Sequence, residues 1–189
     1  GININSLFLG QSDMNNIGLF TADNIRIKSG GGSVIYGSGA IGGTVHLDNS
    51  LSFNKGFTGN FFNEYGSFKT FNSKLKAGFS TEKFSFNASG SFSSSENDYE
   101  VPEKDYKNLS GQYENKSFSL NSGYKINDQN TISWISEIFN TSQNYPIFSV
   151  SQTKTKYESN SFRSLLTWKY RSEKIENYLR TAYLEDEFG

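Results

Sequence analysis

Five acidic residues stand close together in the middle of the chain, and clustered carboxylates can act as general acids and bases or hold a calcium ion. They are Glu96, Asp98, Glu100, Glu103 and Asp105. An EF-hand loop needs a central glycine and a terminal glutamate, and no glycine occurs between Glu96 and Leu109. The spacing therefore favours a solvated, charged loop over a metal or catalytic site.

Other groups that commonly carry chemistry are sparse. The chain has one histidine, His46, and no cysteine, so these residues form neither a zinc site nor a disulfide framework. No Ser-His-Asp set can be assembled around a histidine that lies in a short N-terminal strand pattern. We expect His46 to be structural or exposed, the protein not to be an enzyme, and no cofactor to be bound.

The glycine-rich stretch from Ile25 to Leu47 could cradle a phosphate. A dinucleotide fingerprint has to open a helix, however, and a P-loop needs a Lys-Ser/Thr pair after its last glycine. Here Ser38–Gly43 runs into Thr44–Leu47, which has the pattern of a strand. We therefore predict compact β structure, in which Ile25–Lys28, Val34–Tyr36 and Thr44–Leu47 are short apolar runs separated by glycines.

The composition narrows the class of protein that must position these residues. The 189 residues are 34% hydrophobic and 16% aromatic, with a formal net charge of −1 and a mean hydropathy of −0.59. A polar chain rich in rings is typical of a membrane β-barrel, which shows lipid only every second residue. The low net charge argues against disorder and, with no basic stripe, against nucleic-acid binding. No run approaches the roughly 20 apolar residues of a membrane helix.

From Phe57 onward, apolar and polar residues alternate with a period of two, which predicts seven antiparallel strands. They are Phe57–Tyr65, Lys69–Ser80, Phe84–Ser95, Lys116–Ile126, Thr131–Thr141, Ser159–Arg171 and Ile175–Phe188. If Glu82 and Lys83 form the second turn, Phe79 faces Phe86, Ala77 faces Ala88 and Leu75 faces Gly90. The pairing of the last two strands stays open, because the last strand has apolar residues on both faces.

Short and long links alternate between these strands. Thr81–Lys83, Asn127–Asn130 and Ser172–Lys174 are tight, whereas Glu96–Asn115 and Ser142–Glu158 are long. Outer-membrane barrels have short periplasmic turns and long extracellular loops, and aromatic residues near the strand ends suit their interfacial girdles. A soluble β-sandwich would show the same alternation of apolar and polar residues, so the pattern alone does not separate the two folds.

The stretch from Ile25 to Val45 also resembles the end of the plug domain of TonB-dependent outer-membrane receptors. In that family an Ile-Arg-Ile-Lys type of strand leads through a glycine turn to Ser-Val-Ile-Tyr-Gly-Ser-Gly-Ala-Ile-Gly-Gly-Thr-Val, just before the first barrel strand. This chain has Gly30-Gly31-Gly32 where the family usually has Gly-Pro. The matching motif positions include Arg26, Gly30, Ser33, Tyr36, Gly37, Gly39, Gly42 and Gly43.

The resemblance implies an all-β fold in two parts: residues 1–52 as the C-terminal part of a plug, and residues 53–189 as the first strands of an antiparallel transmembrane β-barrel. A complete receptor would have about 22 strands and a plugged lumen. Family plugs carry an energy-coupling box well upstream of this motif, so we expect the chain to be a piece of a larger receptor.

By the same resemblance, the protein lies in the lipid of the outer membrane of a Gram-negative bacterium. It takes up a scarce solute such as a siderophore, cobalamin, haem or an oligosaccharide, driven by an inner-membrane energy-coupling protein. The tight turns are then periplasmic and the long loops external. Four loop aromatics are the candidates to face the solute: Tyr99, Tyr106, Tyr145 and Phe148.

The alternative is a self-standing β-sandwich or β-repeat adhesin that binds a surface partner. Such a protein needs a closed hydrophobic core. The strands do not recur as a sequence repeat, and Ala88 and Gly90 in mid-strand would fill a sandwich core poorly.

Overall fold

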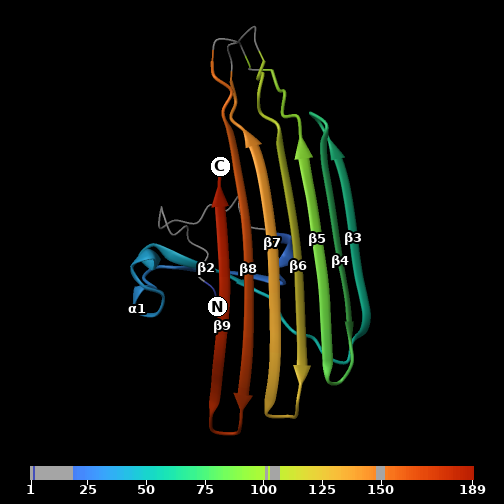
Figure 1. The fold of residues 1–189 in the computed structure, drawn as a ribbon, viewed down its shortest axis with the longest axis vertical. Helices are drawn as coiled ribbons and strands as arrows, with labels where there is room; N and C mark the ends of the chain where they lie inside the picture. The colour runs from blue at the N-terminus through green and yellow to red at the C-terminus, as the bar shows by residue number, and fades with distance from the viewer. Residues whose placement is uncertain (1, 3–18, 101, 103–106, 148–151) are drawn as a thin grey trace.

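The protein consists of two antiparallel β-sheets, seen here in a computed structural model that describes residues 2, 19–100, 102, 107–147 and 152–189. The larger sheet contains seven strands in the order β3-β4-β5-β6-β7-β8-β9, and the smaller pairs β1 with β2. Figure 1 shows the seven strands side by side as an up-and-down meander. Within the described residues β3 and β9 do not pair, so the sheet is open and forms no closed barrel.

All seven predicted strands are present. They are β3 (Gly56–Gly66), β4 (Thr70–Ser80), β5 (Phe84–Ser95), β6 (Tyr113–Lys125), β7 (Asn130–Asn144), β8 (Lys156–Arg171) and β9 (Glu176–Phe188). The strands β6, β7 and β8 run about three residues further toward the long loops than the apolar pattern indicates. Backbone ladder bonds hold these extensions whatever the side chains are, so hydropathy could not locate their ends.

The predicted register between β4 and β5 is confirmed. Phe79 pairs with Phe86, Ala77 with Ala88 and Leu75 with Gly90. The pairing that the sequence left open, between β8 and β9, places Trp168 opposite Leu179 and Leu166 opposite Thr181. The side chains at 179, 181 and 183 therefore share one face with Trp168 and Leu166.

The N-terminal part contains short elements around the small sheet. They are η2 (Leu19–Thr21), β1 (Asn24–Ser29), α1 (Ser33–Tyr36), η3 (Ser38–Ala40) and β2 (Gly43–Asp48). The interpretation of Val34–Tyr36 as part of a β structure was wrong, because these residues form the single helical turn α1, closed by a bond from Tyr36 N to Gly32 O of 2.9 Å. Three apolar residues are too few to show a period. No helix of the described part of the chain is long and apolar enough to cross a membrane.

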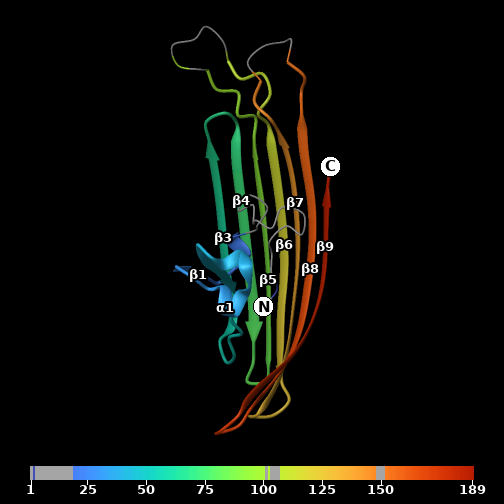
Figure 2. The same cartoon turned by 90° about the vertical axis from the view of Figure 1, so that its left-hand side faces the viewer.

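The polar face of the large sheet is covered and its apolar face is exposed, whereas a soluble protein buries its apolar face. Ser85 is 0% exposed whereas Phe57 is 77% exposed. Among the described residues, the buried hydrophobic side chains are Ala40, Phe139 and Ile147 alone, while serines of β5, β6 and β8 are buried in number: Ser85, Ser89, Ser95, Ser117, Ser119, Ser159 and Ser161. The N-terminal part lies against this polar face, where η2 packs on β5 and β6 (Figure 2).

The outward face is an apolar band of exposed rings and aliphatic chains. The end of this band nearest the tight turns is a row of residues that pair with one another on successive strands: Phe84, Tyr124, Ile132, Trp168 and Leu179. On β5 the outward residues from Phe84 to Phe92 span eight steps, or about 27 Å at the usual rise of a strand. Strands of outer-membrane barrels are tilted by roughly 35–45°, so this length would span about 19–22 Å of height, a little less than their apolar band of roughly 25 Å.

Gly43 fixes the close approach of the two short strands. It opens β2 with φ of 152°, and a Cβ at this position would lie 2.6 Å from the carbonyl oxygen of Lys28 on β1. The neighbouring Gly42 has open space where its Cβ would be. Only glycine at position 43 allows β1 and β2 to pair without strain.

We therefore expect Gly43→Ala to open the β1–β2 ladder and to cost about 1–3 kcal/mol of local stability. Hydrogen exchange of the amides in Asn24–Ser29 would rise by the corresponding 5- to 150-fold. The matched control Gly42→Ala should leave the same amides protected. Equal exchange in the two variants would contradict the role given to Gly43.

Candidate functional site

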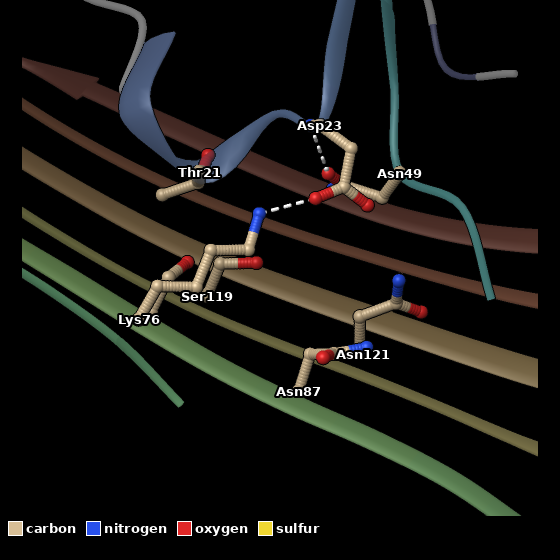
Figure 3. Close-up of a pocket in the computed structure, with 8 residues that line it drawn as sticks. Thr21, Asp23, Asn49, Lys76, Asn87, Ser119 and Asn121 are labelled. Carbon is tan, nitrogen blue, oxygen red and sulfur yellow. Dashed lines mark hydrogen bonds and ion pairs between the residues drawn. The ribbon is translucent and has the colours of Figure 1, made fainter. Parts of the chain in front are cut away.

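The first candidate site is the contact between the N-terminal part and the polar face of the large sheet. Thr21, Asp23 and Asn49 face Lys76, Asn87, Ser119 and Asn121 across it (Figure 3). A polar cavity of about 10 Å³ lies between the two sides, which is about the room that a single water needs. All the residues that line this cavity are polar.

Asp23 is the centre of this contact. Its carboxylate forms an ion pair with Lys76 of β4 and accepts hydrogen bonds from Ser50 N at 2.8 Å and Ser50 Oγ at 3.3 Å. Its backbone N–H donates to Asp48 O at 3.0 Å and to Asn49 Oδ1 at 3.1 Å. Asp23 therefore joins the start of β1 to the end of β2 and both of them to the sheet.

A second attachment point is Glu137 of β7. Its Oε1 accepts from Thr21 Oγ1 at 3.3 Å and from Asn49 Nδ2 at 3.4 Å. Glu137 pairs across the ladder with Arg163, which forms a 3.5 Å ion pair with Asp186 of β9. A row of charges thus crosses the polar face beneath the N-terminal part.

The segment that leads into β3 is also held on the sheet, by apolar and cation–π contacts. The side chain of Leu51 fills the space over Gly123, where a Cβ would come within 2.4 Å of Leu51 Cδ1. The Lys125 ammonium lies 4.2 Å from the centre of the Phe53 ring. On β4, Lys74 lies 5.4 Å from the ring centre of Phe20.

The charge of Asp23 depends on Lys76. Burial raises the pKa of Asp23, but the hydrogen bonds from Lys76 and Ser50 and the Lys76 charge lower it by more, so its pKa lies below the ordinary 3.8. A carboxylate with a depressed pKa stabilises the folded contact above pH 3.8. That stabilisation is lost as the pH falls through the depressed value.

The motif residues from the sequence surround the small sheet. Arg26 pairs with Asp48, with Nε 2.7 Å and one terminal nitrogen 2.6 Å from Asp48 Oδ2. Tyr36 packs edge-on against the ring of His46 at 4.9 Å, and Thr44 Oγ1 lies 3.2 Å from His46 Nε2. His46 therefore has a structural environment, as expected.

The glycines and the serine of the motif shape the backbone. Gly30 N donates to Gly42 O at 3.2 Å, Ala40 N donates to Gly37 O at 3.1 Å, and Ser33 opens α1. Gly39 lies within η3. The motif forms a folded hairpin whose contacts are mainly internal, and Asp23 and Asn49 at its base connect it to the sheet.

The second candidate site is the loop end, where Asn108 ties two long loops together. Asn108 is 1% exposed, and its Nδ2 donates to Asn97 O at 2.9 Å. Its Oδ1 accepts from Ser110 N at 3.1 Å and from Ile147 N at 3.3 Å. One side chain thus links the β5–β6 loop to the β7–β8 loop.

Two of the four predicted solute-facing aromatics lie near Asn108. Asn108 N donates to Tyr99 O at 2.9 Å, and the Tyr99 ring packs against Phe68 with centres 6.5 Å apart. Tyr145 is 50% exposed, and its N–H donates to Thr155 O at 3.0 Å. The other two, Tyr106 and Phe148, lie outside the described residues.

Exposed lysines pair with two residues of the acidic loop, Glu96 and Asp98. Lys69 donates to Glu96 at 2.6 Å, which raises the pKa of Lys69, and Lys107 lies 3.5 Å from Asp98. Within the ranges that the structure describes, no three His, Asp or Glu residues gather as metal ligands would. Glu96 and Asp98 of the predicted acidic cluster therefore form surface ion pairs, while Glu103 and Asp105 lie outside the described residues.

Sequence reasoning missed Asp23, Lys76, Glu137 and Asn108. Lys76 gave one usable signal, since it lies with Lys74 on the polar face of β4. Glu137 gave a weaker one, because it shares its face of β7 with Ile135 and Phe139. Asn108 gave none, because its partners Asn97 and Ile147 are 11 and 39 residues away.

We expect Asp23→Ala to loosen the N-terminal part by about 1–3 kcal/mol, because it removes an ion pair and two hydrogen bonds. Hydrogen exchange of the Ser50 amide would report the loss directly, since this amide donates to Asp23. The control Asp48→Ala removes an exposed ion pair with Arg26 and should cost less than about 1 kcal/mol at Ser50. A larger effect from Asp48→Ala would contradict the central place of Asp23.

Asn108→Ala should loosen the contact between the two loops by about 1–3 kcal/mol, because the Ser110 and Ile147 amides and the Asn97 carbonyl lose a buried partner. The backbone bond from Leu109 N to Ile147 O, of 3.0 Å, stays in place. Tryptic cleavage after Lys154, in the β7–β8 loop that Asn108 holds, should become faster. Asn127→Ala, at a tight turn at the other end of the sheet, should leave that cleavage unchanged. Unchanged cleavage in both variants would show that the loops are ordered without Asn108.

No protein-family model and no curated protein matches the chain. Its function is therefore inferred from its own geometry: a buried polar face that carries the N-terminal part, an exposed apolar face, and a loop end organised around one buried asparagine.

Proposed function

We propose that the chain is the end of the plug and the first seven barrel strands of a TonB-dependent outer-membrane receptor, which takes up a scarce solute. The observation that carries the proposal is the inverted burial of the large sheet. Serines of β5, β6 and β8 are buried while outward phenylalanines such as Phe57 and Phe61 are exposed. Lipid outside and a plug inside would satisfy both faces.

The energetic argument concerns the apolar band. Covering one large apolar side chain is worth about 1.5–3 kcal/mol, and outward residues on every strand of the large sheet remain uncovered. Soluble monomers rarely expose a continuous apolar surface of this extent. Lipid supplies the cover without any further protein.

The adhesin alternative needs a second sheet on the apolar face. The N-terminal part, which contains the small sheet, lies on the polar face instead (Figure 2). That arrangement fits a plug in a lumen and does not fit half of a sandwich core.

The direction of the strands supports the proposed sidedness. β3 runs from the tight-turn end toward the loop end, and the turns β4–β5, β6–β7 and β8–β9 lie together at its starting end (Figure 1). A plug joined to the first strand from the periplasm makes these short turns periplasmic and the long loops external. In a complete receptor, further strands would pair with the open edges of β3 and β9.

The proposed division of labour follows from this orientation. Tyr99 and Tyr145, with Tyr106 and Phe148, meet the solute at the external loops. The N-terminal part closes the lumen and is held by Asp23 and Glu137. An inner-membrane energy-coupling protein acts on an energy-coupling box well upstream of the Ile25–Val45 motif, and its pull releases these polar contacts.

Single cysteines test the topology in cells that make the intact protein, since the chain has no cysteine of its own. Thr153→Cys and Tyr145→Cys should react with a membrane-impermeant maleimide. Asp128→Cys, in the tight β6–β7 turn, should react only after the outer membrane is permeabilised. Labelling of Asp128→Cys before permeabilisation, with no labelling of Thr153→Cys or Tyr145→Cys, would overturn the orientation. Recovery of the protein in the soluble fraction would overturn the membrane location.

A further inference from the structure

A groove of about 380 Å³ lies in the middle of the outward apolar face. Its lining includes Leu75 and Ala77 of β4, Ala88, Gly90 and Phe92 of β5, and Phe118 of β6. A volume of this size lies at the lower end of the range for small-molecule sites, about 300–1,000 Å³. The groove is open to the outside, so a ligand in it would lie along the sheet with one side uncovered.

Small residues in register create the groove. Ala77 pairs with Ala88, and Gly90 pairs with Leu75 on one side and Phe118 on the other. A Cβ on Gly90 would meet only Ser117 O at 3.6 Å and Phe118 Cδ2 at 3.9 Å. The floor at Gly90 is thus open, while bulky residues form the walls.

A cation stands at the end of the groove that points toward the long loops. Lys116 pairs with Phe92 across the ladder, and its ammonium lies 5.8 Å from the Phe92 ring centre. It also lies 2.6 Å from Glu114, the next outward residue on β6. An ammonium has three N–H donors, so a bond from one of them to Glu114 leaves the other two for a further acceptor.

We infer that this groove binds one acyl chain of a membrane lipid whose anionic phosphate headgroup lies at Lys116; the inference rests on the proposed membrane location. Lys116 is one outward step, about 7 Å, from Phe118 toward the loop end. The floor of the groove is therefore apolar and its rim at the loop end is charged, which matches the acyl chain and the headgroup of one lipid. Apolar lining and charge complementarity therefore indicate the same ligand.

Native mass spectrometry of the intact protein, purified from the outer membrane in detergent, tests the site with palmitoyl-oleoyl phosphatidylglycerol and the matching phosphatidylcholine as probes. Gly90→Leu fills the groove and should abolish the most tightly retained lipid. The control Ser136→Leu adds a similar side chain to the outward face of β7, outside the groove lining, and should retain it.

The headgroup site is tested separately, so a folding defect in Gly90→Leu does not decide the outcome. Lys116→Gln should reduce the preference for phosphatidylglycerol over phosphatidylcholine about fivefold, since one lysine near a membrane contributes about 1 kcal/mol. Glu114→Gln should increase that preference, because it frees the ammonium.

Equal lipid retention by Gly90→Leu and Ser136→Leu would overturn the proposed binding of an acyl chain in the groove. An unchanged headgroup preference in Lys116→Gln would overturn the proposed headgroup site. In both cases the protein would still fractionate with the outer membrane. A protein that is released without detergent would instead overturn the membrane location, and the groove proposal with it.

Discussion

The strict alternation of side chains along a β-strand is the constraint on which the rest of this structure depends. Each strand offers one face to each side of the sheet, so the serines and phenylalanines of β5 must meet two different environments. Ser85 and Ser89 are covered, while Phe84 and Phe86 are not. Among the described residues, the covered side of the sheet therefore contains almost no hydrophobic core, and the large apolar side chains lie on the outward side.

The parts of the fold that follow from local pattern could be predicted from the sequence. A period of two gives the strands, and the tight turn at Glu82 and Lys83 then fixes which residues of β4 and β5 are opposite. The helical turn α1 could not be predicted, because one bond from Tyr36 N to Gly32 O decides it. The extension of β7 to Asn144 depends on backbone bonds alone, which leave no trace in hydropathy.

The candidate sites were less predictable because long-range pairs build them. Asp23 and Lys76 are 53 residues apart, and Thr21 and Glu137 are 116 apart. No local spacing relates such residues, although a charged residue on the covered face of a strand is a hint that something polar must cover it. The motif glycines were identified from a sequence resemblance, and the structure gives the physical reason for Gly43, where a Cβ would lie 2.6 Å from Lys28 O on the paired strand.

The chemistry of the contact between the N-terminal part and the sheet decides how it can open. Asp23 and Glu137 hold this part through hydrogen bonds and an ion pair, each worth only about 0.5–3 kcal/mol net because water can replace either partner. Leu51, by contrast, attaches the following segment to β6 through an apolar contact over Gly123 that water does not replace, and the Phe53 ring adds a cation–π contact with Lys125. A pull on the N-terminal part would therefore break the polar contacts one after another, while the segment at Leu51 and Phe53 stays on the sheet as the fixed end.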